Sequence, residues 1–174
     1  MTRVSIVTVL IACMLSIGIF AEESGLSTYV QDSPRFSFGY PKEFVPKELD
    51  GSTEVARYAA PNMFKVPVLV AHVTEAGSDQ SGQALAAEII DRLKAQTPGV
   101  YGFKVTENRE VALSDGSPAR FIKLEWKWVN GTPMETASVV SIDGEQKVAL
   151  SATAFASQQL SDVLAYLCMT LKMS

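Results

Sequence analysis

Cysteine and histidine are scarce in this chain, which has two cysteines and one histidine among its 174 residues. Cys13 lies in an apolar N-terminal run, so a chain that has lost this run keeps only Cys168 and forms no intramolecular disulfide. The same scarcity leaves too few cysteine and histidine ligands for a zinc site. We therefore predict no metal and no cofactor, and a fold that is held by its hydrophobic core.

Basic residues are also in the minority, since 15 lysines and arginines face 19 acidic residues, for a net charge of −4. They form no clustered stretch of the kind that binds a nucleic acid backbone, so nucleic acid is not an expected partner. Glycine-rich phosphate-binding motifs are missing, and no serine lies in the Gly-x-Ser-x-Gly pattern of hydrolases. These patterns predict no catalytic residue.

The N-terminus has the order of features that marks an exported protein. Arg3 is followed by an uncharged, mainly apolar run over residues 4–20, and then by Ala21 and an acidic pair. This order is typical of a signal peptide over residues 1–21, and an uncleaved N-terminal anchor is the alternative. The segment Leu10-Ile11-Ala12-Cys13 resembles a bacterial lipobox and adds a third reading, lipidation at Cys13. Each reading predicts an extracytoplasmic protein that is secreted, periplasmic or associated with the cell envelope.

The rest of the chain divides into a short spacer and one domain. Residues 22–33 are polar and lack periodicity, so we interpret them as a spacer. Residues 34–173 are expected to form a single domain, because about 150 residues suit one hydrophobic core. In the first half of this domain, apolar alternation or continuous apolar runs predict strands. These strands are residues 36–40, the short pair 44–45, residues 54–60 and residues 66–73.

Two segments have the spacing of amphipathic helices. In the first, leucines and isoleucines recur on one face between residues 85 and 93. In the second, leucines recur on one face between residues 160 and 171, and Ser157 is the expected N-cap. Cys168 falls on the apolar face of the second helix, so we interpret it as a core residue.

Three turn dipeptides divide the segment between these helices: Asp115-Gly116, Asn130-Gly131 and Asp143-Gly144. Such pairs tolerate the positive φ angles of type I′ turns and are strong hairpin signals. The predicted structure is a four-stranded antiparallel meander with strands at residues 103–113, 119–129, 134–142 and 146–155. In the second strand, Trp126 and Trp128 share one face and charged residues alternate on the other, which fixes the register.

Aromatic residues provide the candidate ligand site of the sequence. The residues that could line a groove between sheet and helix are Trp126, Trp128, Tyr40 and Tyr58. Aromatic side chains on an inward strand face also serve as ordinary core, and this interpretation stays open beside the first. His72, the only histidine, adds a weak hypothesis of hydrolase chemistry, because triads are defined in space rather than in sequence.

The order of elements resembles that of the PsbP/Mog1/DcrB-like superfamily, in the manner of an exported bacterial or archaeal member. Two motifs carry the resemblance, which covers residues 33–172: Phe36-Ser37-Phe38-Gly39-Tyr40-Pro41 and Asp115-Gly116-Ser117-Pro118-Ala119-Arg120. It implies an α+β fold in which helices flank an antiparallel sheet on both sides, as a Mog1/PsbP-like α/β/α sandwich. It also implies a non-enzymatic role, since the photosystem members bind a larger membrane complex and Mog1 binds a small GTPase.

The leading functional hypothesis is a non-catalytic extracytoplasmic interaction module that docks on a protein partner at the cell envelope. The alternative is a carrier of a small hydrophobic ligand, held in the groove between sheet and helix. A hydrolase that uses His72 is the third hypothesis. Photosystem and GTPase roles are not carried over, because a shared fold does not imply a shared function.

Overall fold

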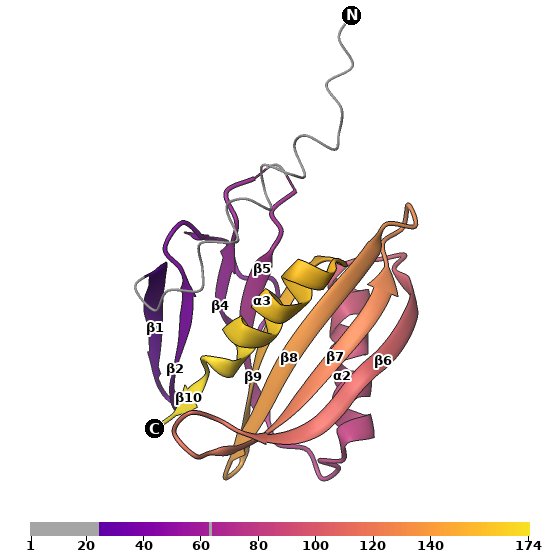
Figure 1. Ribbon diagram of the computed structural model, residues 1–174. Helices are drawn as coiled ribbons and strands as arrows, with labels where there is room; N and C mark the ends of the chain where they lie inside the picture. The colour runs from indigo at the N-terminus through magenta and orange to yellow at the C-terminus, as the bar shows by residue number, and fades with distance from the viewer. Residues whose placement is uncertain (1–24, 63) are drawn as a thin grey trace, which may run out of the picture.

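The computed structural model describes residues 25–62 and 64–174 (Figure 1). The predicted signal peptide or anchor over residues 1–21 and the lipidation at Cys13 lie outside these residues. None of the helices in the described part of the chain is both long enough and apolar enough to cross a membrane.

The largest element is a seven-stranded sheet in the order β3-β4-β5-β9-β8-β7-β6, with every neighbouring pair antiparallel. One side of it is the predicted meander, which comprises β6 (Tyr101–Ala112), β7 (Pro118–Lys127), β8 (Pro133–Asp143) and β9 (Gln146–Phe155). The sequence therefore predicted these four strands and their order correctly.

The other side of this sheet is formed by β3 (Val45–Pro46), β4 (Glu54–Ala59) and β5 (Val68–Glu75). β5 pairs with β9 along its whole length, from Val68 opposite Thr153 to Glu75 opposite Gln146. The predicted apolar strand thus joins the first half of the chain to the meander, and its interior position explains why both of its faces are apolar.

The hairpin turns lie where the dipeptides predicted, but they are not type I′ turns. Gly116, Gly131 and Gly144 have positive φ angles, whereas Lys65 is the only described residue other than glycine with one. In the first hairpin the Gly116 N–H donates to the Leu113 carbonyl, and the Leu113 N–H donates to the Ser117 carbonyl. This pattern is a type I turn followed by a left-handed glycine, which needs a positive φ only at the glycine.

A second, smaller sheet contains β1 (Leu26–Asp32), β2 (Arg35–Pro41) and β10 (Lys172–Met173), with β2 in the middle. The spacer predicted over residues 22–33 is therefore wrong for most of its length, because β1 lies within it and pairs with β2. The prediction was wrong there because the segment looks polar. Its Tyr29 ring nevertheless packs on Phe38 with ring centroids 5.0 Å apart, which gives the strand an inner face.

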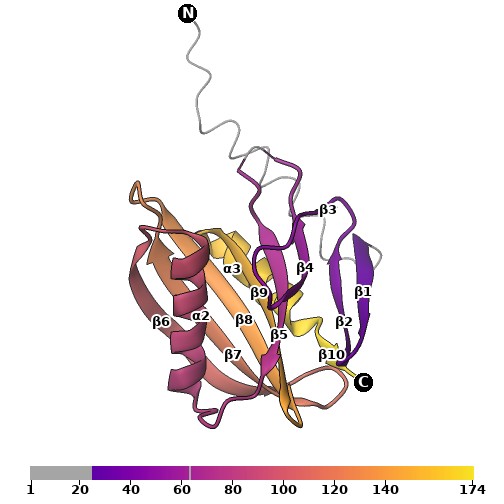
Figure 2. The same cartoon turned by 180° about the vertical axis from the view of Figure 1, so that it is seen from behind.

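The two helices cover opposite faces of the seven-stranded sheet, with α3 in front in Figure 1 and α2 in front in Figure 2. α2 (Gly82–Gln96) begins after Ser81, and its Leu85, Ala86 and Ile89 are buried. α3 (Gln158–Met169) begins after Ser157, whose hydroxyl accepts from the Leu160 N–H as predicted. The α+β fold with a helix on each side of an antiparallel sheet is therefore confirmed.

The two faces of the sheet are packed by different elements. On the face that we call the closed face, α3 and the small sheet cover a core that includes Leu69, Phe121, Val139 and Leu150. On the face that we call the open face, α2 alone packs on β6 and β7. The buried residues of the open face include Ile122, Leu124, Trp126 and Met134.

Candidate functional site

A cavity of about 730 Å³ lies on the open face. Its floor is formed by residues of β4, β5, β7, β8 and β9, and its wall by residues of α2. α2 packs on β6 and β7, and so it does not fill the space above β4, β5 and β9. The cavity therefore exists because a single helix covers only part of this face of the sheet.

Hydroxyl groups form a row across the floor of the cavity. Trp126 Nε1 donates to Thr136 Oγ1 over 3.0 Å, and Thr136 Oγ1 lies 2.8 Å from Thr153 Oγ1. Beside them, the hydroxyls of Ser138 and Ser151 are 2.7 Å apart. An indole N–H only donates, so Thr136 accepts from Trp126, whereas either hydroxyl can be the donor between Thr136 and Thr153. The strand alternation of β8 and β9 brings these polar side chains to the open face.

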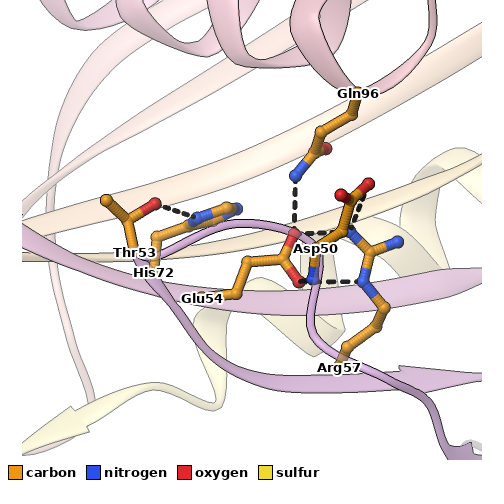
Figure 3. A network of polar contacts seen from close by, with 6 residues as sticks. All are labelled: Asp50, Thr53, Glu54, Arg57, His72 and Gln96. Atoms are coloured by element: carbon orange, nitrogen blue, oxygen red, sulfur yellow. Dashed lines mark hydrogen bonds and ion pairs between the residues drawn. The ribbon is translucent and has the colours of Figure 1, made fainter.

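A buried carboxylate, Glu54, ties three elements together at one end of the cavity (Figure 3). Its side chain is fully buried. It accepts from both Nε and Nη2 of Arg57, from the Asp50 N–H at 2.8 Å and from Gln96 Nε2 at 2.6 Å. Burial acts to raise the pKa of Glu54, but the Arg57 and Asp50 hydrogen bonds outweigh it and hold the pKa below its usual value. The group is therefore an ionised structural anchor.

His72, from β5, lines the cavity next to this anchor and is 5% exposed. Its Nδ1 lies 3.2 Å from the hydroxyl of Thr53 (Figure 3). Burial, assisted by the charge of Arg92, lowers the pKa of His72 to about 4. The ring is therefore neutral and weakly basic near pH 7, whereas an effective general base has a pKa close to the working pH. A neutral, weakly basic His72 does not favour the hydrolase hypothesis.

Arg92, on α2, is a cation of the cavity wall. Its Nη2 lies 3.7 Å from Glu88, and Glu88 is also paired with Lys147 from β9. Its Nη1 is buried and has no hydrogen-bond partner among the described residues. Burial lowers the pKa of Arg92, whereas Glu88 and Glu54 raise it. A guanidinium stays charged in proteins, so this group is a buried positive charge with an unused donor.

The four predicted aromatic residues are not brought together. Trp126 and Trp128 line the cavity, with ring centroids 6.4 Å apart. Tyr40 and Tyr58 instead stack on each other at 3.9 Å and pack against the core of the closed face. Burial, together with the neighbouring Tyr40, raises the pKa of Tyr58 to about 12. Of the four residues predicted to line a groove, only the two tryptophans line this cavity.

The polar residues of the site escaped the sequence reasoning. Glu54, Arg57, Arg92 and Gln96 come from β4 and α2 and form no motif in the sequence. Cys168 is placed as predicted, because it is fully buried and its thiol donates to the Ala137 carbonyl at 3.2 Å. Burial raises its pKa to about 12. Within residues 25–62 and 64–174, no three His, Cys, Asp or Glu side chains are grouped as metal ligands.

Comparisons with known proteins bear on the fold. No protein-family model matches this chain, and the search of curated proteins gave no significant match either. Among solved structures, cyanobacterial PsbP from Synechocystis sp. PCC 6803 is similar with a TM-score of 0.66 and 10% identity, over 89% of this chain and 96% of that one. The Ran-binding protein Mog1p of Saccharomyces cerevisiae is similar with a TM-score of 0.60 and 7% identity, over 85% and 95% of the two chains.

A third similar structure is LpqN of Mycobacterium tuberculosis, described as involved in cell envelope biogenesis. It has a TM-score of 0.54 and 11% identity, over 89% of this chain and 87% of that one. Identities this low concern the fold alone. The architecture and these likenesses together show that this chain has the fold that PsbP, Mog1p and LpqN share.

Proposed function

We propose that this chain is a non-catalytic binding module that works outside the cytoplasm and holds a small ligand in the open-face cavity. The cavity itself carries the proposal. Its volume of about 730 Å³ falls inside the range of about 300–1,000 Å³ that is usual for small-molecule sites. Its lining also has the usual character of such sites, since apolar and aromatic walls are combined with a few polar groups.

The titratable residues at the cavity support binding rather than catalysis. The carboxylate of Glu54 already accepts from Arg57, Asp50 and Gln96. The imidazole of His72 has a pKa of about 4. A general base needs a free lone pair and a pKa near the working pH, and neither group meets both conditions.

The extracytoplasmic part of the proposal rests on the N-terminal sequence, where Arg3, an apolar run and Ala21 follow one another. A structural neighbour described as involved in cell envelope biogenesis adds support. Intact-mass analysis of the protein from its native envelope tests it. A chain that begins at Glu22, or an acylated chain that begins at Cys13, supports export. An unprocessed chain recovered from the cytoplasm contradicts it.

Native mass spectrometry of the purified protein tests ligand binding. We expect an added mass that disappears after denaturation and returns when the extracted molecule is added back. Val68→Phe places a ring at a residue that lines the cavity, so this variant should lose the added mass. Val30→Phe makes the same change at a side chain that is 63% exposed on β1, and it should retain the ligand.

The proposal fails if the protein carries no added mass and if neither variant differs from the original chain in any binding assay. Equal binding by Val68→Phe and Val30→Phe would also contradict it, because the ligand would then lie elsewhere on the molecule.

Docking on a protein partner at the envelope is the second candidate function. The observation that favours it is the apolar mouth of the cavity, where Leu49 and Phe64 are each 52% exposed. Exposed apolar side chains at the rim of a cleft are typical of protein interaction sites. The likeness to Mog1p, a Ran-binding protein, is compatible with a binding role for the fold.

Co-purification from the envelope tests this second candidate. A stoichiometric partner should be lost with Phe64→Asp, at the mouth, and kept with Tyr166→Asp on α3, where the tyrosine is 43% exposed. Loss of the partner with both variants, or with neither, would remove the cavity mouth as the docking site.

A further inference from the structure

The unpartnered buried group of the cavity is a hydrogen-bond donor. Three described side-chain atoms are buried without a hydrogen-bond partner, and they belong to Gln80, Arg92 and Glu135. Of these residues, Arg92 is the one that lines the cavity. A buried donor without an acceptor is unfavourable, and more so when it is charged. The Arg92 side chain is 19% exposed and lines the cavity, so its positive charge can attract an anionic acceptor on a ligand there.

A second donor lies on the cavity floor. Thr136 accepts from Trp126 Nε1 and sits 2.8 Å from Thr153 Oγ1. Either hydroxyl of this pair can be the donor, and when Thr136 donates to Thr153, the proton of Thr153 can be donated to a ligand. Thr153 lines the cavity and is 9% exposed. The floor therefore offers a hydroxyl that can donate to a ligand, in addition to Arg92 on the α2 wall.

The charges around this wall leave one positive charge in excess. Glu88 is a single carboxylate, yet it pairs with both Arg92 and Lys147. Glu54 and Arg57 neutralise each other within a close ion pair. At the mouth, the lysines 47 and 65 balance the acidic residues 48 and 50. The site is thus suited to one negative charge, whereas a dianion such as a phosphate monoester would exceed this balance.

The remaining wall of the cavity is apolar. Val66, Val68 and Met134 line it together with the rings of Trp126 and Trp128. The ring of Phe64, at the mouth, meets Phe155 edge to face at 5.7 Å. Aromatic and aliphatic surface of this kind is a favourable environment for a hydrocarbon body, because burial removes apolar area from water.

We propose that the ligand is a monoanionic amphiphile, a carboxylate whose head group pairs with Arg92 and whose apolar body lies against Trp126 and Trp128. The inference rests on the proposed ligand-binding function and names the ligand class of that same site. It predicts that a carboxylate binds better than a neutral molecule of the same length.

Tryptophan fluorescence reads this site directly, because the chain has only two tryptophans and both line the cavity. The purified protein is titrated with sodium decanoate and, separately, with decanol, both below the concentration at which decanoate aggregates. We expect decanoate to bind at least about tenfold more tightly, since a hydrogen bond to a charged group contributes about 1.5–3 kcal/mol.

Substitutions on α2 test the role of Arg92. Arg92→Gln should abolish the preference for decanoate and leave decanol binding unchanged, while Arg92→Lys should keep part of it. Lys94→Gln is the matched control, because Lys94 lies on the same helix with a side chain that is 55% exposed. This control should keep the full preference. Far-ultraviolet circular dichroism shows that each variant is folded.

The outcomes separate the two proposals. Decanol binding as tightly as decanoate to the original chain overturns the carboxylate inference and leaves the ligand-binding function standing. A preference that survives in Arg92→Gln also overturns the inference, since the head group would then pair elsewhere. If neither decanoate nor decanol binds and native mass spectrometry shows no ligand, both the carboxylate inference and the ligand-binding function are overturned. If Arg92→Gln does not fold, the comparison of decanoate with decanol on the original chain still tests the preference for a carboxylate.

Discussion

The two faces of one sheet are built for different purposes. On β9, neighbouring residues alternate between them: Leu150 and Ala152 belong to the closed-face core, while Ser151 and Thr153 line the open-face cavity. The closed face is covered by a helix and a second sheet, whereas the open face is covered by one helix. The difference shows that the period-2 geometry of a strand lets a single segment supply both stability and a site.

The contrast extends to the chemistry of the buried groups. The closed-face core is mainly aliphatic and aromatic, and it includes Phe36 and Phe38 of β2, whose side chains are fully or almost fully buried on the inner face of the small sheet. Both faces hold buried polar residues: Lys123 contacts Glu135 and Ser161 on the closed face, whereas the open face holds Glu54 and the histidine His72. Buried polar groups are stable only when they are hydrogen-bonded. We therefore expect the closed face to dominate the free energy of unfolding and the open face to control binding and pH dependence.

The largest expected effect is the loss of a closed-face ring. Phe38→Ala removes a side chain that is 1% exposed, and such a change lowers the free energy of unfolding by about 4 kcal/mol. Phe64→Ala is the matched change at the mouth of the open face, where the side chain is 52% exposed, and it should cost less than about 1 kcal/mol. Urea denaturation measures both. Similar losses for the two variants would contradict the division of roles between the faces.

The next effect concerns pH and is confined to the open face, where the only histidine lies. The pKa of His72 is about 4 in the folded protein, against about 6.5 when unfolded. Between these values the unfolded chain binds a proton that the folded chain does not, so stability falls as the pH drops from 6.5 to 4. At pH 4 this proton uptake lowers the free energy of unfolding by roughly 3 kcal/mol relative to neutral pH.

His72→Gln checks this assignment, because glutamine keeps a polar group near Thr53 but does not titrate. Arg92, Arg57, Glu54 and Glu88 all act on the same ring, and the carboxylates among them also respond to acid. The measured quantity is therefore the difference between the two chains in the free energy of unfolding, followed from pH 7 to pH 4. Parallel curves would show that His72 is not the titrating group.

A somewhat smaller effect is expected at the buried ion pair. Glu54→Gln keeps the size of the side chain but removes the charge that faces Arg57, whose side chain is 20% exposed. Removing one partner of a buried pair costs about 3–5 kcal/mol, and the partial exposure of Arg57 reduces this to about 2 kcal/mol. Asp91→Asn changes an exposed pair with Lys94 and should cost less than about 0.5 kcal/mol. Equal effects in a urea titration would contradict the anchoring role of Glu54.

Local patterns in the sequence were sufficient to predict most of the fold. The alternation in β7, the three turn glycines and the Ser157 cap depend on neighbours along the chain, and each lies where it was predicted. The strand β1 was missed because its inner face is formed by few apolar residues, and its partner β2 lies across a turn. The second sheet is closed by β10, from the far end of the chain, a pairing that no local pattern encodes.

The site was much less accessible to such reasoning. Strand alternation identified Trp126 and Trp128 correctly as residues of the open face. Tyr40 and Tyr58 were added because they are aromatic, but they lie on the closed face. The cavity itself depends on which strands α2 packs against. The excess charge at Arg92 depends on Glu88 and on Lys147, which comes from a different element. Such properties arise from tertiary packing and have no local sequence signal.

The smallest expected effect distinguishes hydroxyls that serve the fold from those that serve a ligand. Ser138 and Ser151 hydrogen-bond at 2.7 Å on the open face, and Ser151 lines the cavity. Ser138→Ala and Ser151→Ala should each cost about 1 kcal/mol, and the double variant should cost less than their sum, because removing both partners leaves no unsatisfied group. A coupling of about 0.5 kcal/mol or more in this double-mutant cycle, measured by urea denaturation, would mean that the pair stabilises the fold. Strictly additive losses would instead mean that each hydroxyl acts independently. In that case the 2.7 Å contact between Ser138 and Ser151 would not be a stabilising interaction of the open face.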